Sequence, residues 1–175
     1  GTASTMASMV EALGIGLPGN AAYPAVDGRR NVLARNAGRR IVQMVWDDLT
    51  PAKLLTRANF DNGVACAMAM GCSTNAIIHL IAMSRRAGHA LTLDDFDGAS
   101  RTVPVIANIR PSGDTYLMED FYYAGGLPAM LKRIEAHLHG DALAVNGRTL
   151  AANIAGAEVY NDDVIRPLTN PIYAE

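Results

Sequence analysis

Two short polar segments contain the residue types that best suit the binding of a small acid. Ser73, Thr74 and Asn75 come directly before an apolar stretch with helical spacing. The plainer interpretation is helix capping, because these side chains accept hydrogen bonds from the first free N–H groups of a helix. The same N–H groups, together with the positive end of the helix dipole, also attract a carboxylate. Both interpretations stay open for this segment.

The start of the chain allows the same two interpretations. It reads Gly1-Thr2-Ala3-Ser4-Thr5 and leads into a helical pattern that ends near Leu13. Ser4 or Thr5 is the expected N-cap of that helix. The hydroxyl groups that either cap the helix or face a ligand are those of Thr2, Ser4 and Thr5.

A glycine pair preceded by tyrosines is a further candidate. Gly125 and Gly126 follow Tyr122 and Tyr123 almost directly. A glycine pair breaks the helical pattern, and the tyrosines can either shape a substrate pocket or pack as ordinary aromatic side chains. Gly125 and Gly126 are therefore candidates for residues near a substrate, and the interpretation as ordinary packing stays open beside this one.

The residue types that commonly ligate metals do not form a recognisable pattern. Five residues separate Cys66 from Cys72, and His79 follows seven positions later, which is not a zinc or iron–sulfur spacing. We expect both cysteines to be buried structural thiols and His79 to be a hydrogen-bonded core histidine. His137 and His139 are expected at the surface near a helix end. No metal ligand is therefore assigned among these cysteines and histidines.

Composition and charge narrow the class of protein. Half of the 175 residues are hydrophobic, 18% are charged and the net charge is −2, which predicts a soluble globular protein and argues against nucleic acid or an anionic membrane as partner. The longest apolar stretch, residues 76–83, is far shorter than the roughly 20 residues that span a bilayer. Two cysteines favour a reducing, cytoplasmic location. Five arginines between Arg29 and Arg40 are expected to form a solvated face paired with Asp47 or Asp48.

The elements that must position the polar segments are mostly helices. Hydrophobic periodicity and capping residues predict them over residues 4–13, 27–46, 51–71, 76–86, 92–96, 118–124, 128–138 and briefly after Thr149. The helix over 76–86 is apolar nearly all round and is expected to be buried. Residues 103–109 and 143–145 are expected to be strands. The pattern predicts an α/β fold in which a helical layer covers a sheet.

The same segments resemble those of the dihydroxy-acid dehydratase and phosphogluconate dehydratase family, which includes aldonic-acid dehydratases. Four stretches carry the resemblance in order along the chain. They are Gly1-Thr2-Ala3-Ser4-Thr5-Met6 with Glu11-Ala12-Leu13-Gly14 and Leu17-Pro18-Gly19-Asn20; Met70-Gly71-Cys72-Ser73-Thr74-Asn75 with His79-Leu80; Met118-Glu119-Asp120 with Ala124-Gly125-Gly126; and Val145-Asn146-Gly147 with Asn170-Pro171. Residues 24–27, 120–128 and 164–167 are most like the branch that acts on pentonic or hexonic acids.

The resemblance implies a hydro-lyase that converts a sugar acid to a 2-keto-3-deoxy acid, with an iron–sulfur cluster of the two-iron type as Lewis acid and Mg²⁺ as second cofactor. A dihydroxy-acid dehydratase of branched-chain amino-acid synthesis is the alternative within the family, and a non-catalytic scaffold module without the cluster is the alternative outside it. The substrate would be a small molecule, and the family resemblance favours a homo-oligomer.

This chain also departs from the family pattern. It places the third cluster cysteine just upstream of Gly1, and its magnesium ligands and proposed serine base lie outside residues 1–175. Cys72 stands where the family usually has a second glycine. We therefore expect residues 1–175 to be an internal fragment, part of the N-terminal α/β/α domain without the C-terminal domain, and to be inactive alone.

Overall fold

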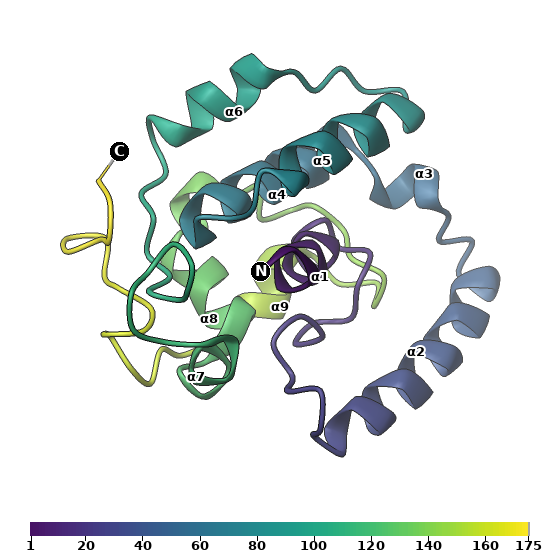
Figure 1. The fold of residues 1–175 in the computed structure, drawn as a ribbon. Helices are drawn as coiled ribbons and strands as arrows, with labels where there is room; N and C mark the ends of the chain where they lie inside the picture. Colours follow the sequence, from purple (N-terminus) through teal and green to yellow (C-terminus); the bar gives the residue numbers. More distant parts are fainter. Residues whose placement is uncertain (175) are drawn as a thin grey trace.

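The computed structural model describes residues 1–174, and helices account for its regular structure. Figure 1 shows them in chain order. Their bounds are α1 Thr2–Ala12, α2 Arg29–Trp46, α3 Pro51–Leu54, α4 Arg57–Met70, α5 Asn75–Arg86, α6 Leu93–Ser100, α7 Met118–Tyr123, α8 Gly126–Arg133, the 3-10 helix η1 Glu135–His137 and α9 Leu150–Ile154. None of these helices is both long enough and apolar enough to cross a lipid bilayer.

Helix α4 forms the centre of the core. Ten of its 14 residues are buried, including Phe60 and Cys66, and it packs against α1, α5 and α6. The helix begins at its N-cap Thr56, whose hydroxyl accepts a hydrogen bond from the Asn59 backbone N–H, and it ends at Gly71 in the left-handed conformation. The single helix expected over residues 51–71 is therefore two helices, because Thr56 starts α4 anew after the short α3.

Local capping signals predicted several other helix boundaries correctly. Pro51 opens α3 behind Thr50, and Thr149 caps α9 by accepting from the Ala152 N–H. Thr92 and Asp95 form the predicted capping box of α6. The expected cap of α1 was wrong, because Gly1 is its N-cap and Ser4 and Thr5 lie inside the helix.

The predicted strands do not form a sheet among residues 1–174. The segment 103–109 is buried as expected, but it makes only isolated bridges, including Val105 with Tyr173 and Ala107 with Ile165. Its N–H groups at Ile106 and Ala107 instead donate to the Ala69 carbonyl near the end of α4. Residues 143–145 likewise contribute one bridge, Leu143 with Thr149. The helix-rich part of the prediction is confirmed, whereas the α/β sheet is not.

Helix α5 is less buried than its composition predicts. Only Ala76, Leu80 and Ser84 are buried, while Ile78 is 66% exposed and His79 is exposed as well. The expectation that His79 is a core histidine was therefore wrong for the described residues. One face of α5 covers α4 and α1, and the opposite face lies open.

Candidate functional site

A cavity of about 370 Å³ lies where the N-terminus of α1 meets the turn between α4 and α5. Three chain segments build it: the first residues of the chain, the turn 70–73 and the loop from Ile109 to Glu119. The polar and small residues that line it are Gly1, Ser4, Thr5, Gly71, Cys72, Ser73, Arg110, Ser112 and Glu119. Two helices, α1 and α5, begin beside this cavity, so their positive dipole ends favour an anion there.

Hydroxyl and amide groups from the two predicted polar segments meet beside this cavity, which is lined by Ser4, Thr5 and Ser73 but not by Thr2 or Asn75. Thr5 Oγ1 accepts a hydrogen bond of 3.3 Å from the Ser73 backbone N–H, and Thr2 Oγ1 lies 3.4 Å from Ser73 Oγ. Asn75 Nδ2 donates to Ser73 Oγ at 3.1 Å and to Thr2 Oγ1 at 3.4 Å. The fold therefore brings together candidate residues that lie about 70 positions apart in sequence, with Ser4 beside them in the cavity wall.

Three of the candidate residues lie elsewhere. Thr74 is exposed, and Thr74, Gly125 and Gly126 are not among the residues that line the cavity. Gly125 is the N-cap of α8 with φ of 117°, and a Cβ built there would lie 2.3 Å from the Glu158 carbonyl oxygen. Close backbone packing and a left-handed conformation therefore account for Gly125.

The tyrosines next to this glycine pair form an aromatic cluster. The rings of Tyr122 and Tyr23 lie 5.3 Å apart, and Tyr123 packs edge-on against Tyr122 at 5.2 Å. The Arg29 guanidinium lies 5.0 Å from the centre of the Tyr122 ring. None of these residues lines the 370 Å³ cavity, so the packing interpretation accounts for their positions.

The cavity also contains residues that the sequence patterns did not indicate. Arg110 and Ser112 approach it from the loop before α7, and Glu119 approaches it from the first turn of α7 itself. The Ser112 hydroxyl donates to the Gly71 carbonyl oxygen and so fixes this loop against the end of α4. The sequence does place Arg110 and Ser112 on either side of Pro111, but only the tertiary fold brings these two residues beside the α4–α5 turn.

The two cysteines occupy different environments. Cys66 is fully buried in α4, as predicted, and burial raises the pKa of its thiol well above the ordinary value. Cys72 is half-buried at the cavity, where burial raises the pKa of its thiol to about 11, although a hydrogen bond with Thr5 lowers it. Neither environment therefore activates the thiol as a nucleophile.

The described residues do not fit either cofactor that the family resemblance implies. Within residues 1–174 no three side chains among His, Cys, Asp and Glu gather as a set that could hold a metal ion. An iron–sulfur cluster needs thiolates, and the only thiol at the cavity is that of Cys72, with its raised pKa. The surface positions predicted for His137 and His139 are confirmed. No chemical step is assigned to a metal through residues 1–174.

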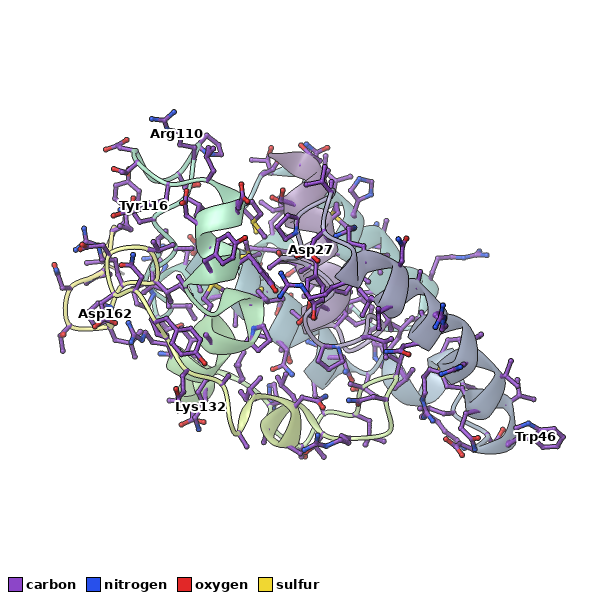
Figure 2. All side chains as sticks on the ribbon, turned by 90° about the horizontal axis from the view of Figure 1, so that it is seen from below. Asp27, Trp46, Arg110, Tyr116, Lys132 and Asp162 are labelled. Atoms are coloured by element: carbon purple, nitrogen blue, oxygen red, sulfur yellow. The ribbon has the colours of Figure 1, made fainter. Side chains whose placement is uncertain are left out.

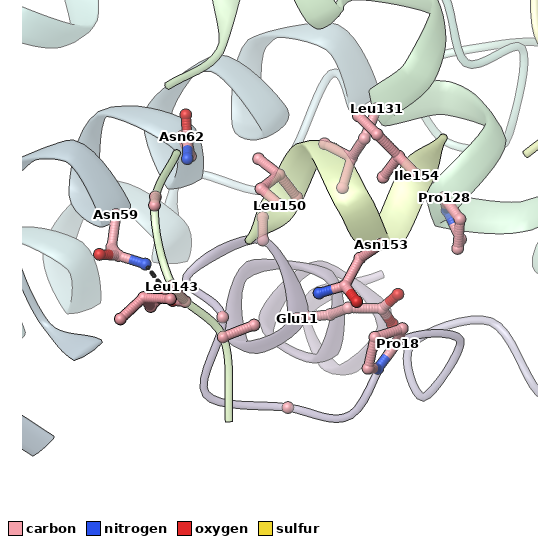
Figure 3. A pocket seen from close by; sticks show the side chains of 15 residues that line it. Glu11, Pro18, Asn59, Asn62, Pro128, Leu131, Leu143, Leu150, Asn153 and Ile154 are labelled. Atoms are coloured by element: carbon pink, nitrogen blue, oxygen red, sulfur yellow. Dashed lines mark hydrogen bonds between the residues drawn. The ribbon is translucent and has the colours of Figure 1, made fainter. Parts of the chain in front are cut away.

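A buried carboxyl group lies near the C-terminal end of α1, away from the 370 Å³ cavity. Glu11 lies in α1 beside a small cavity of about 20 Å³, shown in Figure 3 with Pro18 and Asn153 next to it. Its Oε1 accepts from the Gly19 N–H at 2.6 Å and its Oε2 from the Ala21 N–H at 2.7 Å. The carboxyl group therefore holds the loop after α1 against the helix.

The burial of Glu11 predicts that the free energy of unfolding depends on pH. Burial raises the pKa of Glu11 from 4.5 to about 7, although the Ala21 and Gly19 N–H groups lower it. Glu11 then binds its proton more tightly in the folded than in the unfolded chain, so the associated stability is complete below pH 4.5 and is lost as pH rises through about 7. The free energy of unfolding should fall by about 3 kcal/mol over this window, at about 1.4 kcal/mol for each pKa unit.

Denaturant unfolding of the protein and of Glu11→Gln between about pH 5 and about pH 8 tests this. Glutamine keeps one acceptor for the loop amides and cannot ionise, so the variant should lose most of the fall in stability with pH. Parallel pH profiles for the two proteins would show that Glu11 titrates normally.

Comparison with known proteins assigns the family. Residues 1–153 match the model described as dihydroxy-acid/6-phosphogluconate dehydratase N-terminal. The chain is 56% identical over 159 residues to an L-arabinonate dehydratase of Rhizobium leguminosarum, covering 90% of this chain and 27% of the relative. It is 49% identical over 172 residues to a 6-deoxy-6-sulfo-D-gluconate dehydratase of Pseudomonas putida, covering 98% of this chain and 30% of the relative.

A relative with another substrate is also similar. The chain is 45% identical over 175 residues to a dihydroxy-acid dehydratase of Metallosphaera sedula, covering 97% of this chain and 31% of the relative. The chain thus spans about 30% of the length of the curated relatives that it matches. Because the family model covers most of its residues, the chain belongs to the dihydroxy-acid/6-phosphogluconate dehydratase family.

Proposed function

We propose that the protein containing this chain is a hydro-lyase that dehydrates a sugar acid, and that the 370 Å³ cavity contributes to binding of the substrate carboxylate. The observation that carries the proposal is the meeting of Thr2, Thr5 and Ser73 at the point where α1 and α5 begin. Hydroxyl donors beside two helix N-termini suit a carboxylate. The similarity to an L-arabinonate dehydratase supports an aldonic acid as the substrate class.

In the proposed reaction the substrate loses the proton on C2 and the hydroxyl group on C3 as water. The resulting enol then tautomerises to a 2-keto-3-deoxy acid. An iron–sulfur cluster and Mg²⁺ are part of this proposal, with ligands outside residues 1–174, because these residues do not supply them. What these residues would contribute is orientation of the acid group, through the hydroxyl and amide donors at the start of α1 and α5.

An assay of the intact protein separates the two substrate classes within the family. We expect kcat/KM for L-arabinonate to exceed that for 2,3-dihydroxy-isovalerate by at least about tenfold, because a site built for several hydroxyl groups leaves polar groups unpaired around a branched aliphatic chain. Formation of the 2-keto acid is the measurement. The similarity to the dihydroxy-acid dehydratase of Metallosphaera sedula favours the second candidate, and the opposite preference would establish it.

Absence of dehydration for these two acids and for 6-deoxy-6-sulfo-D-gluconate, in protein loaded with cluster and magnesium, would instead favour a non-catalytic module that has kept the scaffold. Such a module should still fold, so the same preparation must show a cooperative unfolding transition before the result counts. This control separates a lost activity from a misfolded sample.

A further inference from the structure

The turn that carries Ser73 begins at a glycine. Residues 71–73 connect the end of α4 to Thr74, the N-cap of α5. Gly71 has φ of 59°, and a glycine changes its backbone conformation at less steric cost than any other residue. The position of the Ser73 hydroxyl therefore depends on what holds the peptide group that joins Gly71 to Cys72.

This peptide group is held from two sides. Its N–H group, that of Cys72, donates to the Ala67 carbonyl oxygen at 3.0 Å, so α4 holds one side. Its carbonyl oxygen, that of Gly71, accepts from the Ser112 hydroxyl, which belongs to the loop before α7. Removing the Ser112 hydroxyl would leave the carbonyl side without this donor, and the peptide group could then rotate.

Ser112 also packs closely against the turn. A Cβ built on Gly71 would lie 2.6 Å from the Ser112 Cβ and 2.7 Å from its Oγ. Any side chain at position 71 would therefore collide with Ser112, so the glycine permits the approach that the hydrogen bond requires. The contact joins two segments that lie 41 positions apart in sequence.

The loop that provides this hydroxyl, residues 109–116, is itself fixed. The Arg110 backbone N–H donates to the Tyr116 carbonyl oxygen at 2.9 Å and closes the loop. Figure 2 shows Arg110 and Tyr116 near each other at one edge of the molecule. Just before the loop, Asn108 Nδ2 donates to the Asp163 carbonyl oxygen at 3.1 Å. A hydroxyl group on a loop held in this way is a firm support for the flexible turn beside it.

We propose that Ser112 is a positioning residue, whose hydroxyl holds the α4–α5 turn so that the Ser73 hydroxyl lies at the 370 Å³ cavity. Ser112 lines the same cavity, but its hydroxyl proton is donated to Gly71, so its effect on a bound acid passes through the turn. The inference rests on the proposed function, because it concerns how a hydroxyl group that binds the carboxylate is held in place.

Amide hydrogen exchange of the intact protein tests the positioning without an assay of activity. In Ser112→Ala the N–H groups of Cys72 and Ser73 should exchange at least about fivefold faster, while the buried amides of α4 keep their rates and show that the variant is folded. Ser100→Ala is the matched control, because Ser100 Oγ also donates to a backbone carbonyl oxygen, that of Asp97 at 2.8 Å, and should leave the turn unchanged. Unchanged exchange at the turn in Ser112→Ala would overturn the proposal. Faster exchange throughout α4 would overturn it as well, since the hydroxyl would then support the core as a whole.

Kinetics of the intact protein with L-arabinonate connect the turn to the substrate. We expect Ser112→Ala to lower kcat/KM at least about fivefold, mainly through KM, because a misplaced donor binds the acid less well. In a Ser73→Ala background the same change should cost less than about twofold, since the hydroxyl that it positions is absent. Equal losses in the two backgrounds, or no loss from Ser112→Ala in an enzyme that Ser73→Ala impairs, would overturn the positioning role. No loss from Ser73→Ala would instead contradict the proposed function, and hydrogen exchange would then decide whether Ser112 holds the turn.

Discussion

Replacing Gly125 with alanine is expected to lower the free energy of unfolding by about 3–5 kcal/mol, because the change adds backbone strain to a steric clash. Gly125 has φ of 117°, a conformation that residues with a Cβ rarely adopt. The added methyl would lie 2.3 Å from the Glu158 carbonyl oxygen and 2.6 Å from the Ala129 Cβ, so either the loop at Glu158 or α8 must move. Denaturant unfolding of the protein and the variant measures the loss.

Gly98 provides a matched control. It lies inside α6, it does not need a positive φ, and a Cβ there would meet no atom within 4 Å. Gly98→Ala should therefore stabilise the protein by about 0.5–1 kcal/mol, since alanine loses less backbone entropy in a helix. A Gly125→Ala protein that keeps its stability but loses activity would contradict the packing explanation and restore Gly125 as part of a substrate pocket.

The sequence predicted helices well where local chemistry sets their ends. Thr92 and Thr149 act as the predicted caps in the structure, and glycines such as Gly71 end helices by adopting the left-handed conformation. These features depend on a few neighbouring residues, so the sequence contains the necessary information. The first turn of α1 differs, because three possible capping residues follow Gly1 and the sequence does not distinguish among them.

Pairing and burial were harder to predict because they depend on distant residues. The β-branched run 103–109 has strand propensity, but its backbone N–H groups donate to Ala69, Val164 and Tyr173 instead of to a neighbouring strand. Helix α5 is apolar on most sides, yet among the described residues only one of its faces has a partner. Propensity describes the segment, whereas these outcomes depend on what the rest of the molecule places beside it.

The candidate site was predicted in part for the same reason. The two polar segments were identified individually, but their meeting through Thr2 and Ser73 spans 71 positions and no local pattern encodes it. The glycine pair at Gly125 and Gly126 shows a second difficulty. A glycine required by backbone conformation and a glycine required by a ligand look identical in one sequence, and only the position of Glu158 distinguishes them.

Replacing Ser73 with alanine in the intact protein is expected to lower kcat/KM for the sugar acid by about 10- to 100-fold, since a hydrogen bond to a charged group contributes about 1.5–3 kcal/mol. Ser73 Oγ lies within 3.4 Å of Thr2 Oγ1 and accepts from Asn75 Nδ2, so its loss also frees the two groups that flank it. If the hydroxyl group binds the carboxylate and takes no part in the chemistry, most of the change should appear in KM.

Thr74→Ala is the matched control for Ser73→Ala. Thr74 is the next residue in the sequence, but its side chain is exposed, makes no cap hydrogen bond and does not line the cavity. The same deletion of a hydroxyl group should therefore leave kcat/KM within about twofold, because surface substitutions without partners rarely exceed about 0.5 kcal/mol. Equal losses in the two variants would indicate a general disturbance of the α4–α5 turn. If Ser73→Ala leaves kcat/KM unchanged, the cavity is not part of the substrate-binding site. Residues elsewhere in the protein then bind the carboxylate.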